Sequence, residues 1–237
     1  MDRLRETDTA NDPLLRPVWN CLNGRQSRLA VARGTAVRID PRYGPFAAAQ
    51  DQSGEAQAAL AALLTGPGDA VWLVEAEPWP APPGTRVVRT ATLLQMVAIH
   101  PMPSQPADGE FVTLGEVDVP EMAALAGATE PGPWGPLTHR YGQFYGLRAG
   151  GRLIAMAGER MLPAAGLAEV SGVCTYPEFR GAGLAARLIR WVMAAQQARG
   201  DVPFLHSYAA NASAIRLYET LGFRARCEMV ATVLIQG

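Results

Sequence analysis

The pattern of apolar and polar positions divides the chain into two stretches of mixed helix and strand. After a polar arm over residues 1–27, the N-terminal third predicts a small α/β unit. Its expected elements are a hairpin over residues 28–40, a helix over 55–64, a buried strand over 70–75 and a longer strand over 86–99. No glycine-rich ligand loop occurs in this unit, so the chemistry is expected in the remainder of the chain.

A proline-rich stretch separates the two parts. Residues 100–110 contain three prolines, which cannot lie in the interior of a sheet. We therefore predict a linker here, with an N-terminal α/β domain over residues 1–105 and a second domain over residues 111–237. His100 precedes a proline in this linker and is expected to be exposed.

The second part predicts nine elements in the order β-α-β-β-β-α-β-α-β. The strands are expected over residues 111–115, 144–148, 152–158, 169–175, 203–208 and 227–235, with helices beginning near Asp118, Leu184 and Asn211. The helix after Leu184 is amphipathic, because apolar residues recur on one of its faces. This order predicts an α/β (α+β) fold with a mixed, mostly antiparallel sheet flanked by helices.

Composition narrows the range of partners. The 237 residues are 49% apolar and carry a net charge of −1, which gives no global field toward nucleic acid or a membrane surface. No run of eighteen apolar residues predicts a membrane span. The three cysteines are scattered and lack the spacing of a metal site, so no metal is expected. We expect these thiols to be reduced, which indicates a cytoplasmic protein. All 21 basic residues are arginine.

A glycine-rich turn between a strand and a helix is the main chemical feature. Residues 169–187 read E-V-S-G-V-C-T-Y-P-E-F-R-G-A-G-L-A-A-R. Small residues let backbone N–H groups approach a ligand closely, and the first N–H groups of a helix favour an anion. The stretch therefore predicts a phosphate cradle. Gly181, Gly183 and Ala186 also fit the dinucleotide fingerprint G-x-G-x-x-A, with Asp201 about twenty residues on, so nicotinamide binding is a competing interpretation.

The stretch also resembles motif A of the GNAT superfamily of acyl-CoA-dependent N-acetyltransferases, written Q/R-x-x-G-x-G/A. Arg180, Gly183 and Ala185 fill its three fixed positions. Some thirty residues later, residues 211–223 match N-x-x-A-x-x-x-Y-x-x-x-G-F at every fixed position. The resemblance covers about residues 112–237 and implies a GNAT fold. By analogy, the N-terminal domain is interpreted as a possible degenerate second copy.

The resemblance assigns the cosubstrate, acetyl-CoA, to named backbone positions. Val173, Cys174 and Thr175 would hydrogen-bond the pantetheine arm. The pyrophosphate would lie on the loop and helix start, formed by Arg180, Gly181, Ala182, Gly183, Leu184, Ala185 and Ala186. Asn211 would contact the arm or hold the exit of the last strand. Trp134 and residues 138–141 would contact the acceptor.

Catalytic roles also follow from the resemblance. Tyr218 matches the general acid that protonates the departing thiolate. Glu169 and His206 match positions of general bases in different branches of the superfamily, although histidine departs from the pattern at its position. The unperturbed pKa of a glutamate is about six units below that of an alkylammonium. Direct proton transfer from the amine to Glu169 would therefore need desolvation or a water relay. Ordered water without a dedicated base is the third alternative.

The resulting hypothesis is an N-acetyltransferase that moves acetyl from acetyl-CoA to a primary amine by direct transfer. The acceptor would be a small molecule or a peptide, and a homodimer is left open. The alternative is a non-catalytic acyl-CoA-binding sensor or regulatory protein. Tyr218 favours the enzyme, because a pure binder needs no general acid.

Overall fold

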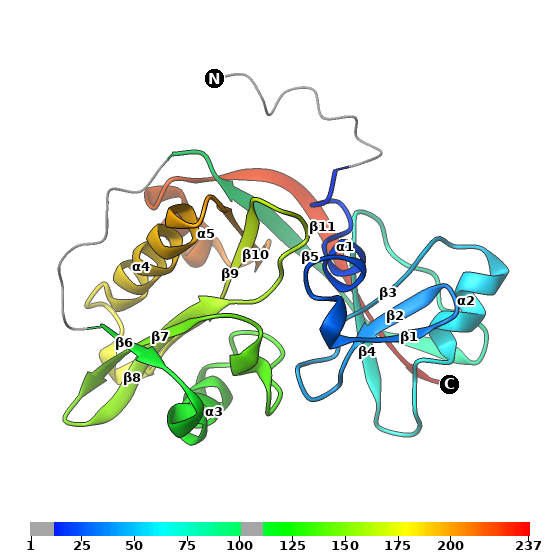
Figure 1. Cartoon of the computed structure of the whole chain (residues 1–237), viewed down its shortest axis with the longest axis horizontal. Helices are drawn as coiled ribbons and strands as arrows, with labels where there is room; N and C mark the ends of the chain where they lie inside the picture. Colours follow the sequence, from blue (N-terminus) through cyan, green and yellow to red (C-terminus); the bar gives the residue numbers. More distant parts are fainter. Residues whose placement is uncertain (1–11, 101–110) are drawn as a thin grey trace.

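A large mixed sheet forms the framework of the molecule (Figure 1). The structure is a computed structural model that describes residues 12–100 and 111–237. In this part of the chain the sheet has eight strands in the order β4-β11-β5-β10-β9-β8-β7-β6. They are β4 (Ala70–Glu75), β5 (Thr85–Ala98), β6 (Phe111–Leu114), β7 (Phe144–Ala149), β8 (Arg152–Glu159), β9 (Leu167–Thr175), β10 (Val202–Tyr208) and β11 (Phe223–Gln236). The pair β9–β10 is parallel and the others are antiparallel, which confirms the predicted sheet type.

Helices cover this sheet, and a second, smaller sheet lies at one end of the molecule. The helices are α1 (Pro17–Asn23), α2 (Gly54–Ala61), α3 (Val119–Thr129), α4 (Leu184–Ala198) and α5 (Ala212–Thr220). The small sheet consists of β1 (Ala30–Arg33), β2 (Ala36–Ile39) and β3 (Ala47–Ala49). Short 3-10 helices occupy Ser27–Leu29, Glu116–Asp118, Thr138–Arg140 and Pro177–Phe179. From β6 onward, the order of strands and α-helices is the predicted one.

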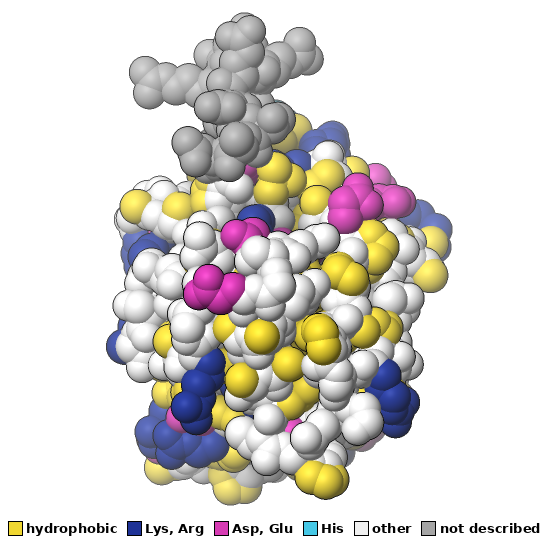
Figure 2. Space-filling view, turned by 90° about the vertical axis from the view of Figure 1, so that its right-hand side faces the viewer, with side chains coloured by type: hydrophobic (Ala, Val, Ile, Leu, Met, Phe, Trp, Pro, Cys, Tyr) yellow, Lys and Arg dark blue, Asp and Glu magenta, His cyan; other side chains and the backbone are white. Residues whose placement is uncertain are grey.

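The two faces of the large sheet carry different cores. On one face the apolar side of α4, with Leu188, Ile189 and Val192, packs against Met96 and Leu205. On the other face α1 and the small sheet pack against residues of several central strands. This second core includes Val18, Cys21, Ile39, Val74, Val97, Phe204 and Met229. Figure 2 shows the side formed by the small sheet and α2, over which charged side chains of both signs are dispersed.

The predicted polar arm is partly wrong. Residues 1–11 lie outside the described residues, but residues 17–23 form α1, which begins at Pro17. Proline is favoured at a first helical position because its missing N–H would have no partner there. Val18, Cys21 and Leu22 are buried on the inner side of the helix. This segment therefore belongs to the core.

The predicted boundary between residues 105 and 111 does not separate two sheets. Strand β5, from before the boundary, lies between β11 and β10 and pairs with both. Strand β4 completes the edge beyond β11. The parts of the chain before and after the predicted linker therefore build one sheet. Of this linker only His100 is described, and it is exposed as expected; residues 101–110 lie outside the described residues.

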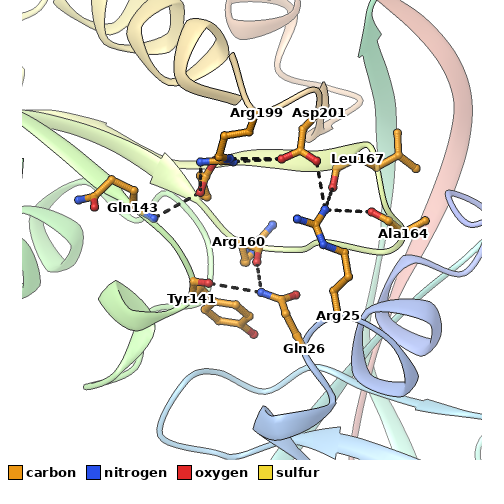
Figure 3. A network of polar contacts seen from close by, with 10 residues as sticks. Arg25, Gln26, Tyr141, Gln143, Arg160, Ala164, Leu167, Arg199 and Asp201 are labelled. Atoms are coloured by element: carbon orange, nitrogen blue, oxygen red, sulfur yellow. Dashed lines mark hydrogen bonds and ion pairs between the residues drawn. The ribbon is translucent and has the colours of Figure 1, made fainter. Parts of the chain in front are cut away.

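Hydrogen bonds connect the segment that follows α1 to the loop between β8 and β9 (Figure 3). Arg25 Nη1 donates to the carbonyls of Ala164 (3.0 Å) and Leu167 (3.2 Å). The buried Gln26 amide donates to the carbonyl of Arg160 (2.8 Å) and accepts from the amide of Leu162 (3.0 Å). These contacts fix the backbone of Arg160, which faces the site described next.

Candidate active site

The site forms where the two parallel strands separate. Strands β9 and β10 pair only from Leu167–Glu169 to Val202–Phe204. Beyond these residues β9 continues to Thr175 and β10 to Tyr208 without pairing to each other. Gly172 has a φ of +61° within β9, a conformation that favours glycine. The separation leaves one edge of β9 open beyond Glu169.

Two of the three predicted strand positions face the resulting cavity. Val173 and Thr175 line it, and Thr175 Oγ1 is buried without a hydrogen-bond partner among the described residues. The Cys174 side chain instead packs into a core with Met122 and Phe144 on the opposite side. Burial raises the pKa of the Cys174 thiol to about 12, so this thiol stays protonated. Only the backbone of Cys174 is therefore available to a ligand.

The glycine-rich loop has the backbone geometry of a cradle. Gly181 and Gly183 have φ values of +84° and +73°, and a Cβ added to either would meet no atom within 4 Å. Gly183 is the N-cap of α4 and no side chain caps the helix there, so the first amide groups of the helix lack intrahelical partners. The Arg180 Nε donates to the carbonyl of Thr175 (3.2 Å) and ties the loop to β9.

A single cavity of about 840 Å³ joins this loop to the opposite face of the sheet. The loop and the start of α4 contribute Arg180, Gly181, Gly183, Leu184, Ala185 and Ala186. Ala182 does not line the cavity, unlike the other predicted loop residues. The far end, which we call the acceptor end, is lined by Phe46, Trp72, Val74, Leu93, Met161 and Ala231.

Helix α5 brings Tyr218 and Asn211 to the cavity wall. The Tyr218 ring packs edge-on against Phe223, with ring centres 6.1 Å apart. Burial raises the pKa of Tyr218, so the phenol carries its proton at neutral pH. Asn211 caps the helix, because its Oδ1 accepts from the Ala214 amide (3.2 Å) and from Ser213 Oγ (3.0 Å). Asn211 therefore has a structural task that the motif did not reveal.

Glu169 is a buried ion-pair partner. Its carboxylate accepts two bonds from Arg160, both 3.0 Å long, and one from the Met161 amide (3.2 Å). Burial by itself raises the pKa of Glu169, but the charge of Arg160 and the bonds from His206 and Arg160 outweigh it and hold the pKa at about 2. The carboxylate is fully buried and does not line the cavity. In this arrangement it is a weak base without access to an amine.

His206 lines the cavity, but both of its ring nitrogens have partners. Nδ1 lies 2.8 Å from Glu169 Oε1, and Nε2 lies 3.0 Å from Gln95 Nε2. Gln95 Oε1 accepts from Arg226 (2.7 Å) while its Nε2 donates to the carbonyl of Leu14 (2.8 Å), which fixes the orientation of the amide. Gln95 therefore donates to Nε2, and His206 carries its proton on Nδ1. No lone pair of the ring is left for an incoming amine.

The competing nicotinamide interpretation is wrong. Asp201, the expected ribose ligand, is buried and pairs with Arg25 (3.1 Å) and Arg199 (3.2 Å). The fingerprint also needs a doubly wound parallel sheet, whereas the described sheet has one parallel pair.

The residues expected to contact the acceptor, Trp134 and residues 138–141, lie away from the cavity. Thr138 Oγ1 accepts from the Gly135 amide and donates to the carbonyl of Tyr43, both at 2.7 Å. His139 and Arg140 bind Glu116, and Tyr141 is buried in the core. Neither these residues nor Trp134 line the cavity, which is bordered here by residues 129–133.

Sequence reasoning missed the N-terminal contribution to the site. Phe46, Trp72 and Leu93 lie far from the motifs in the sequence, and the sheet brings them to the acceptor end. Gln95 was missed as well, although a glutamine within the apolar stretch of a predicted strand is a usable signal. Within the described residues, no group of three or more His, Cys, Asp and Glu is placed to hold a metal ion. No helix there has the length and apolarity needed to cross a membrane.

Comparison with known proteins identifies related chains. The family model described as "FR47-like protein" matches residues 144–231. The chain is 31% identical over 131 residues to the N-alpha-acetyltransferase RimI of Mycobacterium tuberculosis, covering 50% of this chain and 82% of that one. A crystal structure from Novosphingobium aromaticivorans, assigned to the GNAT family of acetyltransferases, is 65% identical with a TM-score of 0.91, covering 96% of this chain and 100% of the other. A GCN5-related N-acetyltransferase from Kribbella flavida shares the fold, with 21% identity, a TM-score of 0.57 and 92% of each chain covered.

Proposed function

Because the chain belongs to the GNAT superfamily of N-acetyltransferases, we propose that it transfers an acetyl group directly from acetyl-CoA to a primary amine. The continuous cavity carries this proposal, since it runs from the glycine-rich loop past Tyr218 to the acceptor end. Both substrates could therefore meet between the separated strands.

The residues of the loop and β9 fit acetyl-CoA, which supplies the acetyl group as a thioester. The open edge of β9 after Glu169 offers unpaired backbone groups to the amide-rich arm. The unpartnered Thr175 Oγ1 offers one more polar atom at the same edge. Gly181 and Gly183 leave room for phosphate oxygens at the start of α4, where the helix dipole favours negative charge.

Tyr218 would donate its proton to the leaving sulfur as the carbon–sulfur bond breaks. Reference pKa values of a tyrosine and a thiol differ by about 1.5 units, or roughly 2 kcal/mol. Burial raises the pKa of Tyr218 further, but the same desolvation also raises the proton affinity of a thiolate beside it. A short hydrogen bond in this dry environment could offset the remaining difference.

We assign water as the acceptor of the proton that the attacking amine loses. The contacts of Glu169 and His206 leave neither residue with an open acceptor in this arrangement. Ordered water was one of the three sequence-based alternatives, and it requires no rearrangement of the buried network. We extend the proposal to a cytoplasmic location, which the three free cysteines support.

Turnover assays test this function. Purified protein is mixed with acetyl-CoA and a panel of primary amines, and free thiol is measured over time. Amine-dependent thiol release together with an acetylated product of the expected mass supports transfer. Acetyl-CoA binding without release for any amine would instead support the sensor alternative.

A further inference from the structure

We propose that the acceptor end selects a small primary amine that carries both an apolar body and a carboxylate, the chemistry of a free apolar amino acid, and that Arg89 binds the carboxylate. The inference rests on the proposed function, because this amine is the acceptor of the proposed reaction. It adds a specificity-determining residue that no motif of the chain contains.

One wall of the acceptor end is apolar. In the large sheet Val74 pairs with Ala231, and Ala231 pairs with Ala91. Residues paired across antiparallel strands lie on the same face, as do residues two apart on one strand. Leu93 and Trp72 therefore share this face. Such a surface favours an acceptor with an aliphatic or aromatic body.

Arg89 adds a positive charge beside this wall. It lies on β5, two residues before Ala91, and its side chain reaches across the same face. The guanidinium carbon lies 5.9 Å from the ring centre of Trp72 and 5.3 Å from that of Tyr208, and both rings line the cavity. Stacking uses the flat face of a guanidinium and leaves its N–H edge open for a carboxylate.

Within the described residues, no acidic side chain compensates the charge of Arg89. Arg89 is exposed, and no carboxylate in residues 12–100 and 111–237 forms an ion pair with it. By contrast, the nearby Arg160 uses Nε and Nη2 on Glu169. Among the described lining residues Glu130 is the one carboxylate. A polycationic acceptor would therefore find few partners at the described lining, whereas a carboxylate could pair with Arg89.

Pairs of amines that differ only in the carboxylate provide the test. The ratio of kcat/KM is measured for leucine over isopentylamine and for phenylalanine over 2-phenylethylamine. We expect the intact enzyme to prefer both amino acids. In Arg89→Gln the ratio should fall about 10- to 100-fold, the range of a lost hydrogen bond between charged groups. Arg86→Gln removes the same charge from an exposed residue of the same strand that does not stack on Trp72 or Tyr208, and it should leave the ratio unchanged.

Other results would overturn the inference. Equal use of the paired amines, or a ratio that Arg89→Gln does not change, would leave Arg89 without a role in selection while turnover itself upheld the proposed function. Better use of leucyl-alanine than of leucine would instead identify a peptide N-terminus as the acceptor. Calorimetric titration of leucine into the CoA-bound protein needs no turnover. Leucine binding that Arg89→Gln weakens would support the inference even if acetyl transfer failed.

Discussion

Substitution of the buried Glu169 tests whether this residue stabilises the fold or acts as a general base. In Glu169→Gln the Arg160 guanidinium loses its counter-charge while remaining buried. The new amide also presents N–H groups to donors on Arg160 or His206. Removing one partner of a buried ion pair typically destabilises a protein by about 3–5 kcal/mol. A pKa held at about 2 instead of 4.5 corresponds to a similar figure, about 3 kcal/mol.

Thermal unfolding followed by circular dichroism measures this effect. For a chain of this length each kcal/mol shifts the midpoint by roughly 2–4 °C, so we expect a fall of about 10 °C. Because the folded pKa of Glu169 lies below its unfolded value, the stabilisation is complete above about pH 4.5 and is lost as the pH falls toward 2. The difference between the two proteins should therefore shrink over that range.

An exposed glutamate provides the matched control. Glu178 pairs with Arg152, and both side chains are about half exposed, so Glu178→Gln should leave the midpoint unchanged. A Glu169→Gln protein that melts like the original chain but has lost turnover would refute the structural interpretation. It would restore Glu169 as a candidate general base.

Three further substitutions test separate parts of the site. Tyr218→Phe should lower kcat by 100-fold or more, the usual range for a general acid, with little change in the KM for acetyl-CoA, measured by thiol release. His206→Gln should leave the shape of the pH–rate profile unchanged, because neither ring nitrogen is open to the amine; loss of an ionisation would contradict this. Gln26→Ala leaves the Arg160 carbonyl and the Leu162 amide without this partner, so denaturant unfolding should show a loss of about 2–4 kcal/mol. An unchanged midpoint would show that water replaces the amide.

The cradle could be predicted from the sequence because its function depends on local backbone chemistry. The order strand, Gly181-x-Gly183 and amphipathic helix determines which backbone groups are exposed, whatever the rest of the chain does. The same holds for the hairpin between β7 and β8, in which Gly150 and Gly151 both adopt positive φ. Such features involve few residues that are close in the sequence.

The acceptor end could not be predicted because it depends on long-range pairing. Trp72 and Leu93 reach the cavity only because β4 and β5 flank β11, which lies more than a hundred residues later. The prolines of the predicted linker suggested a boundary between two separate units. They do not reveal that strands before and after the linker pair with each other. The roles of Glu169 and His206 were equally hidden, because the partners Arg160 and Gln95 come from other strands or loops.

Calorimetric titration of the purified protein with acetyl-CoA, CoA and NADH tests the central claim most directly. We predict micromolar binding of both CoA species and none of NADH. Gly183→Glu, which adds bulk and negative charge to the cradle, should abolish CoA binding. Gly200→Glu introduces the same residue at another positive-φ glycine that does not line the cavity, and it should retain binding. Failure of the intact protein to bind CoA, or full binding by Gly183→Glu, would contradict the assignment of the cradle.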